Sequence, residues 1–529
     1  MKHFNTLLLS ITAFLLFIAG CDSNDSNPPG LPQLSLSSTT VSLTPNEQTM
    51  VTVSISADGN IASVTAEATT GSVTVVNVTG VGSRTGTAEI QYTAPSQPDD
   101  GSITVTVRDQ ENQANSAQIQ VLISEAPPTV VSGGEVTGVW EAGKTFIVQG
   151  DVIIPQGQSL TIEEGVTIII EGDGSQGGSP EFTVFGSLYS FGTEEAPIFF
   201  TVPEELRTEA NIFAGLWGGI LATETAEELV LLYTHVEFAG APAAADSPIV
   251  QSGELDEGEP RYGVFFANPQ GKFVMMHSRI AYSKDDAFRP NGAQLLMAFN
   301  VFEFNGETGG EGINIKGGTV GDVAYNLFFS MGTNGPKWSN SGGRSPQTDV
   351  NVYNNTIINS GFRRAAAGRG GSVNVEGGAR GLSYNNLIVN SRFGVRLVQE
   401  PNNADEANMR VGYSFYYGDT QSIVDEFYPS VGTLSPGDFE TEFDIAGGVG
   451  ENDPLFVNFD VTGFDPSAET DPSTAQFRDP SYDFRLQSNS PALNAGTTNF
   501  SPRLASITAG GRTFEAPAPS SFIGAFGSN

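Results

Sequence analysis

Apolar and polar residues alternate in short runs through the first hundred residues after position 33. The runs span residues 34–36, 49–55, 89–92, 103–107 and 119–123. Turn-forming triplets such as Asp58-Gly59-Asn60 and Asp99-Asp100-Gly101 separate them. Alternation with a period of two puts successive side chains on opposite faces of a strand, and many such strands within about 90 residues predict a β-sandwich.

A longer repeat begins after residue 129. Six seven-residue segments align without gaps, starting at Leu232, Met276, Ala298, Ala324, Tyr353 and Tyr384. Their third positions are Thr234, Ser278, Asn300, Asn326, Asn355 and Asn386. From Ser278 onward these positions recur at intervals of about 22 to 31 residues, which is the period of a solenoid and excludes a helix as the explanation.

Stacking of β-coils explains the repeat. In a parallel β-helix, equivalent residues lie ~4.8 Å apart in successive coils, so the asparagines would form a hydrogen-bonded ladder. Two positions further on, an apolar column is expected from Val236, Ile280, Phe302, Phe328, Ile357 and Ile388. One strand earlier in the coil, alternation predicts that Ile313, Ile315, Val373 and Val375 point inward and that Asn314, Lys316, Asn374 and Glu376 point outward.

Both parts of the chain resemble known families. Residues 33–125 are similar to bacterial immunoglobulin-like modules, and Ala126-Pro127-Pro128 marks a stiff boundary. The runs 160–167, 185–188, 192–201 and 216–220, with 453–457, 483–486, 490–496 and 522–526, resemble the first and last coils of right-handed parallel β-helix lipoproteins. The expected fold is therefore all-β, with an Ig-like β-sandwich followed by a right-handed parallel β-helix over residues 129–529.

The N-terminus carries an export signal. A polar start at Lys2 and His3 precedes an apolar run over residues 7–18, which is shorter than the ~20 residues that span a membrane. The sequence Ile18-Ala19-Gly20-Cys21 then resembles the lipobox of bacterial lipoproteins. The resemblance implies a signal peptide over residues 1–20, acylation of Cys21 that anchors the chain to a lipid bilayer, and a tether over residues 21–32.

Two export rules conflict over the membrane leaflet. Asp22 and Asp25 resemble the acidic export tags of surface lipoproteins in Bacteroidota-like bacteria, which favours the outer membrane and its outer surface. In enteric bacteria, an Asp directly after the Cys resembles an inner-membrane retention signal instead. The expected location is the cell envelope.

Composition excludes several classes of function. The net charge is -36, with 24 Lys and Arg against 60 Asp and Glu, so the surface repels nucleic acid and no nucleic-acid partner is expected. The single Cys leaves the mature chain without a disulfide, a thiolate zinc site or a Cys nucleophile. An Asp-x-Asp-x-Asp-Gly spacing is missing, and no metal site is predicted.

The segment Lys284-Asp285-Asp286-Ala287-Phe288-Arg289 has the residues for chemistry. Pectin-cutting β-helix enzymes place paired Asp residues on neighbouring coils as acid and base, but this chain lacks the Gly-His-Gly and Arg-x-Lys motifs of polygalacturonases. A lyase would need a Lys or Arg base, with Ca²⁺ or another cation against the uronate carboxylate, and Lys284, Arg289, Lys316 and Arg396 lie on consecutive coils. The alternative is ordinary ion pairing on a solvated face, as between Lys316 and Glu376.

Two acidic inserts, at residues 241–261 and 401–477, are expected to form loops on the binding face. Trp338 is a candidate platform for sugar stacking or a packing residue at the coil edge.

The favoured hypothesis is a lipid-anchored protein whose β-helix binds polysaccharide without catalysis. The candidate binding residues are Lys284, Asp285, Asp286, Arg289, Asn314, Lys316, Asn374, Glu376 and Arg396. The first alternative is a polysaccharide lyase or glycoside hydrolase acting on uronate polymers, and the second is a structural spacer without ligand. No cofactor is expected, with Ca²⁺ as the one cation considered.

Overall fold

A computed structural model describes residues 30–125, 127–364 and 366–528. Two compact units divide the chain between Pro127 and Pro128. The proposed signal peptide, the acylated Cys21 and tether residues 21–29 lie outside the described residues. Within the described ranges, none of the helices is both long and apolar enough to cross a bilayer.

The first unit is a β-sandwich of two four-stranded sheets. One sheet has the order β1 (Gln33–Leu36), β3 (Gln48–Ser56), β6 (Thr85–Thr93) and β5 (Ser72–Val78); the other has the order β2 (Thr40–Leu43), β8 (Ala114–Ile123), β7 (Gly101–Asp109) and β4 (Ile61–Ala68). Alternate residues of β3 and β6 are buried between the sheets, with Val53 and Ile90 fully enclosed. The alternating runs found in the sequence all lie in these strands, which confirms the predicted sandwich.

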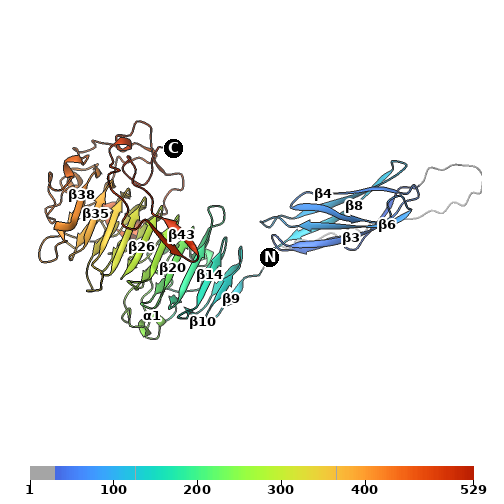
Figure 1. The fold of residues 1–529 in the computed structure, drawn as a ribbon, viewed down its shortest axis with the longest axis horizontal. Coiled ribbons are helices and arrows are strands. Elements are labelled where there is room, and N and C mark those ends of the chain that lie inside the picture. The colour runs from blue at the N-terminus through green and yellow to red at the C-terminus, as the bar shows by residue number, and fades with distance from the viewer. Residues whose placement is uncertain (1–29, 126, 365, 529) are drawn as a thin grey trace, which may run out of the picture. The chain divides into compact units, whose positions relative to one another are not determined.

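The second unit is a parallel β-helix whose coils each contribute one strand to each of three sheets (Figure 1). Sheet I consists of β10 (Gly134–Glu135), β13 (Val152–Ile154), β16 (Phe182–Val184), β19 (Ile220–Ala222), β22 (Val264–Phe266), β25 (Phe288–Pro290), β28 (Ile313–Ile315), β31 (Pro336–Ser339), β34 (Val373–Glu376) and β37 (Val395–Leu397). Sheet II consists of β11 (Gly138–Trp140), β14 (Ser159–Glu163), β17 (Ser187–Phe191), β20 (Glu228–Leu232), β23 (Lys272–Met276), β26 (Ala293–Ala298), β29 (Thr319–Ala324), β32 (Asp349–Tyr353), β35 (Arg380–Tyr384) and β38 (Met409–Gly412).

Sheet III completes the coils. It consists of β9 (Thr129–Val131), β12 (Thr145–Val148), β15 (Thr167–Ile170), β18 (Ile198–Thr201), β21 (Thr234–Glu237), β24 (Arg279–Ala281), β27 (Val301–Asn305), β30 (Leu327–Met331), β33 (Thr356–Ile358), β36 (Leu387–Val389) and β39 (Phe415–Tyr417). Neighbouring strands within each sheet pair in parallel, as β27 does with β30 and β30 with β33. The predicted all-β architecture is confirmed.

The predicted asparagine ladder is present at the bend between sheets II and III. Oδ1 of Asn326 accepts from the backbone N–H and from Nδ2 of Asn300, at 3.0 and 2.9 Å. Asn355 repeats both bonds to Asn326, and Asn386 repeats them to Asn355. Because these side chains are buried, the ladder satisfies polar groups that would otherwise cost about 1 to 3 kcal/mol each.

The residue before each ladder position has a left-handed backbone, with φ of 50° at His277, 61° at Phe299 and 55° at Tyr325. Bulky residues rarely adopt this conformation. Here it turns the chain from sheet II into sheet III. The side-chain rings at these positions stack, with 4.9 Å between the ring centres of His277 and Phe299 and 5.4 Å between those of Phe299 and Tyr325. The repeat therefore stabilises both the bend and an aromatic stack outside it.

The interior of the coils is an unbroken hydrocarbon core. The predicted apolar column is in register, since Ile280 pairs with Phe302, Phe302 with Phe328, and the series continues through sheet III. Trp338 belongs to this core: it is 0% exposed, and its Nε1 donates to the carbonyl of Arg380. The interpretation of Trp338 as a sugar-stacking platform is wrong, because strand alternation turns the ring inward while its neighbour Lys337 points outward.

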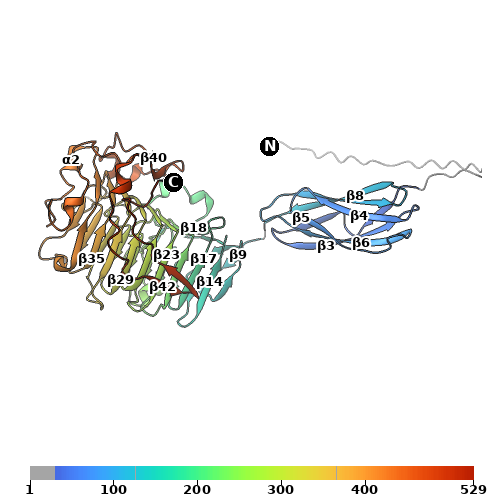
Figure 2. The same ribbon diagram turned by 45° about the horizontal axis from the view of Figure 1, so that its top comes forward.

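Additional segments cover parts of each sheet. They contain α1 (Pro248–Gln251), α2 (Gln421–Val424), β40 (Phe456–Asn458), β41 (Asp483–Leu486), β42 (Ser506–Ala509) and β43 (Arg512–Glu515). The β42–β43 hairpin packs Ile507 and Phe514 on the outside of sheet II, and Figure 1 shows it lying across the strands near β20 and β26. Figure 2 shows β40 and the orange-to-red C-terminal part lying along the β-helix.

Short 3₁₀ turns complete the secondary structure of the second unit. They are η1 (Glu204–Leu206), η2 (Glu209–Asn211), η3 (Glu406–Asn408), η4 (Thr441–Phe443), η5 (Ala468–Thr470), η6 (Pro472–Thr474) and η7 (Pro491–Asn494).

Candidate functional site

A column of polar side chains lies on the outer face of sheet I, at the coils of β25 to β37. Asn314 is in register with Lys337, Lys337 with Asn374, and Asn374 with Arg396. The pairing of Phe288 with Ile313 puts Arg289 beside Asn314 at the start of the column. Because the flanking residues of these strands point into the core, each coil adds one outward polar group at the strand spacing.

Two carboxylates adjoin at the head of this column. Nδ2 of Asn314 donates to Oδ2 of Asp286 at 2.8 Å and to Oε2 of Glu311 at 3.3 Å. The backbone N–H of Glu311 also donates to Oδ1 of Asp286 at 2.8 Å. Among the described residues, Oδ1 of Asn314 is buried and has no hydrogen-bond partner. The cluster thus has an acceptor oxygen that a bound donor group could satisfy.

Lys337 connects the head of the column to its middle. Its Nζ lies 3.4 Å from Oε1 of Glu311 and 3.1 Å from Oε1 of Glu376. Asn374 donates to Glu376 at 3.2 Å and accepts from Nε of Arg396 at 2.7 Å. The polar side chains therefore form one continuous network across four strands, instead of separate solvated groups.

The network shifts the pKa values of its members. Burial and the neighbouring charge of Asp286 raise the pKa of Glu311 to about 7. Burial, Lys337 and Arg289 lower the pKa of Lys316 to about 8. Burial also opposes the charge of Lys337, but the carboxylates of Glu311 and Glu376 outweigh it, and the pKa of Lys337 is raised. A carboxyl group with a raised pKa and an amine with a lowered pKa therefore lie on one face.

Most of the sequence-predicted residues meet in this network. Asp286, Asn314, Asn374, Glu376 and Arg396 are buried within it, whereas Asp285, Arg289 and Lys316 are partly exposed. Lys284 lies in the preceding turn, where its backbone N–H donates to the carbonyl of Ala239.

The charged residues Glu376, Lys337 and Arg289 of sheet I differ in their partners and in their exposure. Glu376 pairs with Lys337, so the suggested surface pair of Lys316 with Glu376 is replaced by a nearly buried one. Arg289 lies over the ring of Tyr262, with its guanidinium carbon 4.8 Å from the ring centre, and its side chain remains 34% exposed. Arg289 is therefore a cation of the network that a ligand can reach.

Glu311 and Lys337 are functional candidates that sequence reasoning missed. A signal for Glu311 exists in the spacing: Asp286, Glu311 and Asn334 each stand three residues before a member of the outward column. Lys337 was hidden because its strand lacks the Asn-x-Lys or Asn-x-Glu pattern of its neighbours. Both follow from the strand register once the coils are aligned.

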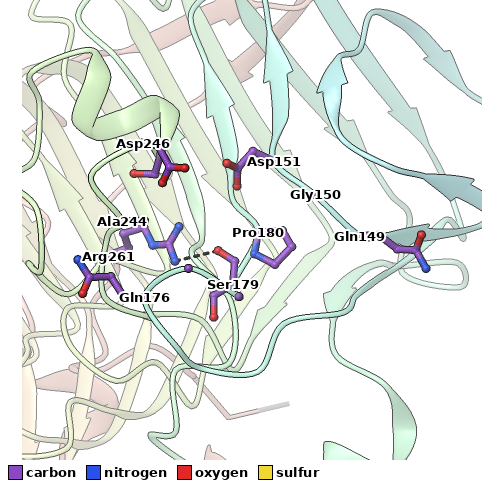
Figure 3. A pocket seen from close by; sticks show the side chains of 12 residues that line it. Gln149, Gly150, Asp151, Gln176, Ser179, Pro180, Ala244, Asp246 and Arg261 are labelled. Atoms are coloured by element: carbon purple, nitrogen blue, oxygen red, sulfur yellow. Dashed lines mark hydrogen bonds between the residues drawn. The ribbon is translucent and has the colours of Figure 1, made fainter.

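A pocket lies at the other end of sheet I, beneath the insert 241–261 (Figure 3). It has a volume of about 180 Å³, and its lining includes Asp151, Ser179, Asp246 and Arg261. Arg261 is buried, donates to the carbonyl of Ser179 and pairs at 2.8 Å with Glu181, which is also buried. Burial and the charge of Glu181 raise the pKa of Asp151.

The insert separates this pocket from the polar column. Its residues Ile249 and Leu255, with Tyr262, pack against Leu221 and Phe265, which occupy the same outward positions of sheet I as Arg289 does one coil later. The insert thus lies on the face that carries the candidate site, covering the coils before it.

The two histidines of the described residues lie elsewhere. His235 is on sheet III, 4.6 Å from the ring of Phe199, and burial lowers its pKa to about 4. His277 belongs to the aromatic stack. In the described part of the chain, no cluster of three or more His, Cys, Asp or Glu is arranged to hold a metal ion.

Comparison with known proteins finds likeness in structure alone. No protein-family model matches the chain, and no curated protein matches it. The BIgI domain of β protein from S. agalactiae, solved bound to CEACAM1, is 13% identical over 18% of this chain and 99% of that one, with a TM-score of 0.15. Surface layer protein SbsC, domains 1–6, is 18% identical over 19% of this chain and 14% of that one, also at 0.15.

The β-helix also has a distant structural counterpart. A family 28 exopolygalacturonase from Yersinia enterocolitica is 9% identical over 74% of this chain and 92% of that one, with a TM-score of 0.23. At such identities the likeness concerns fold, which hosts many functions. Function must therefore be argued from the side chains of sheet I.

Proposed function

We propose that the outer face of sheet I binds an anionic, uronate-containing polysaccharide at the bacterial cell envelope. Four of five successive coils of this face carry a cation, namely Arg289, Lys316, Lys337 and Arg396, although the whole chain has 24 Lys and Arg against 60 Asp and Glu. Cations on several coils of one face suit a polymer whose carboxylates repeat, with Arg289 and Lys316 as the partly exposed ones.

The observation that carries this proposal is the environment of Lys316. Burial lowers its pKa to about 8, and the charges of Lys337 and Arg289 add to this shift against the opposing charges of Asp286 and Glu311. An anion bound beside Lys316 would relieve this repulsion. A sugar hydroxyl could at the same time donate to the unpartnered Oδ1 of Asn314.

Burial favours binding over catalysis. Asp286 and Glu311 are almost completely enclosed, and both already accept hydrogen bonds from Asn314. The partly exposed groups are the cations Arg289 and Lys316, together with Asp285. The face therefore offers charge for recognition, while its closest carboxyl pair is engaged within the protein.

Titration calorimetry of the purified protein tests the proposal. We expect binding of polygalacturonate that weakens with salt, and no binding of fully methyl-esterified polygalacturonate, which has the same rings without charge. Arg289→Gln and Lys316→Gln should each weaken binding about tenfold, a loss of ~1.4 kcal/mol. Lys144→Gln, at an exposed position of an early coil, is the matched control. Equal affinity for both polymers would contradict the proposal.

Cleavage of the same polymer is the second candidate, favoured by the raised pKa of Glu311 beside Asp286. A carboxylic acid with a pKa of about 7 can protonate a glycosidic oxygen while a neighbouring carboxylate activates water. New reducing ends that disappear in Glu311→Gln would support a hydrolase, and unsaturated ends would support a lyase. Retention of intact polymer would support binding without catalysis. If the protein neither retains nor cleaves the polymer, the structural spacer without ligand is the remaining hypothesis.

The proposed location rests on the N-terminal sequence. Residues 1–20 would be removed, and acylated Cys21 would hold the tether 21–32, the Ig-like unit and the β-helix at the membrane. Labelling of cells with a palmitate analogue should mark the native protein and leave Cys21→Ala unmarked. Equal labelling of both would exclude Cys21 as the anchor. Protease treatment of intact cells then distinguishes the outer surface from the periplasm.

A further inference from the structure

A second cavity lies over sheet III, outside the site described above. Its volume is about 390 Å³, within the ~300–1,000 Å³ of small-molecule sites. Phe304 and Phe329 of sheet III line one part of it, together with Asn359 and Arg363. Residues of the segment 459–482, which includes the end of the long insert, line the rest. Figure 2 shows this part of the chain in orange to red near β40.

Two aromatic rings at this cavity are partly exposed to solvent and pack against neighbouring rings. Phe477 and Tyr482 each remain 37% exposed. Phe477 lies 5.1 Å from the ring of Tyr282, and Tyr482 lies 4.9 Å from that of Phe459. Rings fixed by such neighbours offer rigid apolar faces, against which the C–H groups of a pyranose ring can pack at little cost in conformational entropy.

The polar lining consists mainly of acceptors. Oδ1 of Asp460, Asp471 and Asp479 each accepts the backbone N–H two residues further on. Hydrogen bonds from the hydroxyl and the backbone N–H of that residue lower the pKa of all three aspartates. Because each turn uses only Oδ1, the second oxygen of an ionised carboxylate is left as an acceptor. Oδ1 of Asn359 is buried and has no partner within the described residues. A ligand rich in hydroxyl donors would satisfy these groups.

The charge of the cavity excludes an anionic ligand. Arg363 is bound by Ser330 and lies 3.6 Å from Glu469. Arg478 donates from Nε to Glu303 at 2.5 Å. Both cations are therefore neutralised within the protein, whereas the three aspartates remain ionised. The cavity is the electrostatic opposite of sheet I.

We propose that this cavity binds one or two rings of a neutral saccharide, stacked on Phe477 and Tyr482 and held by hydroxyl bonds to the aspartates and Asn359. The site goes beyond the proposed function of sheet I, because it recognises an uncharged sugar through different residues on a different sheet. Its occupancy does not depend on Lys316 or on any anionic polymer.

Saturation-transfer NMR of the purified full chain tests the inference, with cellobiose, maltose, lactose and mannobiose as separate probes at ~10 mM and digalacturonate as the charged comparison. We expect transfer to at least one neutral disaccharide and a dissociation constant at least tenfold higher in Phe477→Ala. Phe443→Ala removes another exposed ring, which stacks on Tyr413 and does not line the cavity, and it should bind as the native chain does.

A second variant guards against loss of structure in the first. Ala468 lines the cavity and is exposed, so Ala468→Trp should fill the space without disturbing the core and should also weaken binding at least tenfold. Lys316→Gln should leave the affinity for the neutral disaccharide unchanged. Three results would each overturn the inference: no transfer to any neutral probe, preference for digalacturonate, or unchanged binding in both cavity variants.

Discussion

Nζ of Lys337 lies 3.1 Å from Oε1 of Glu376, across the adjacent strands β31 and β34 of sheet I. The same ammonium lies 3.4 Å from Glu311, so one cation stands between two carboxylates of different coils. All three side chains are nearly buried. This arrangement links the carboxylates at the head of the column to the residues of the next coils through one shared ammonium group.

Removing the central cation should destabilise the β-helix strongly. In Lys337→Met, Glu376 and Glu311 lose their shared partner in a nearly water-free setting, and we expect a loss of about 3 to 5 kcal/mol in the free energy of unfolding. Urea denaturation followed by tryptophan fluorescence measures it, because Trp140, Trp217 and Trp338 all lie in the β-helix. Lys144→Met should change stability by less than ~0.5 kcal/mol. Equal stability of both variants would show that the pair is dispensable.

Interrupting the asparagine ladder should also destabilise the β-helix. Asn326→Ala leaves the backbone N–H and Nδ2 of Asn300 without their acceptor, at a cost of about 1 to 3 kcal/mol for each buried group. The same fluorescence assay compares it with Asn499→Ala, an exposed position near the C-terminus. A native unfolding midpoint in Asn326→Ala would mean that the ladder adds little to stability.

Stability should fall as the pH rises from about 4.5 to 7, in part because of Glu311. Its pKa in the folded state is about 7, above the ordinary value of 4.5, so the folded state keeps a proton that the unfolded state has lost. The unfolded state thus binds fewer protons in this window, and the free energy of unfolding decreases. Thermal unfolding at intervals of half a pH unit should show a shallower decrease in Glu311→Gln. An unchanged slope in the variant would assign the effect to other groups.

Binding of polygalacturonate should weaken between pH 7 and pH 9 if Lys316 contacts the polymer. The pKa of this amine is about 8 in the free protein, so its charge is lost across this range, while the uronate carboxylates remain ionised. Lys316→Arg keeps its charge and should bind with a flatter pH profile. Calorimetry at three pH values measures the difference. If the affinity of the native chain and that of Lys316→Arg depend on pH in the same way, Lys316 does not contact the polymer.

Strand-level features could be read from the sequence because their causes are local or periodic. Asn300, Asn326 and Asn355 recur at one position of each coil, so aligning them recovered the ladder and the apolar column behind it. Alternation likewise identified Asn314 and Asn374 as outward residues before their partners were known. For Trp338 the sequence left a sugar-stacking role and a packing role open, because its polar neighbours concealed the same alternation, and its burial excludes the first.

The amino-acid order alone determined a β-sandwich followed by a stacked β-helix, since a period of two and a repeat of about 22 to 31 residues each admit few structures. Only the tertiary structure decided that Glu311 and Lys337 join Asp286 and Glu376 in one nearly buried network. Turns of unequal length set the register between coils, and long-range packing of the inserts sets burial, so neither the charge pairing nor the cavity over sheet III follows from neighbouring residues in the chain.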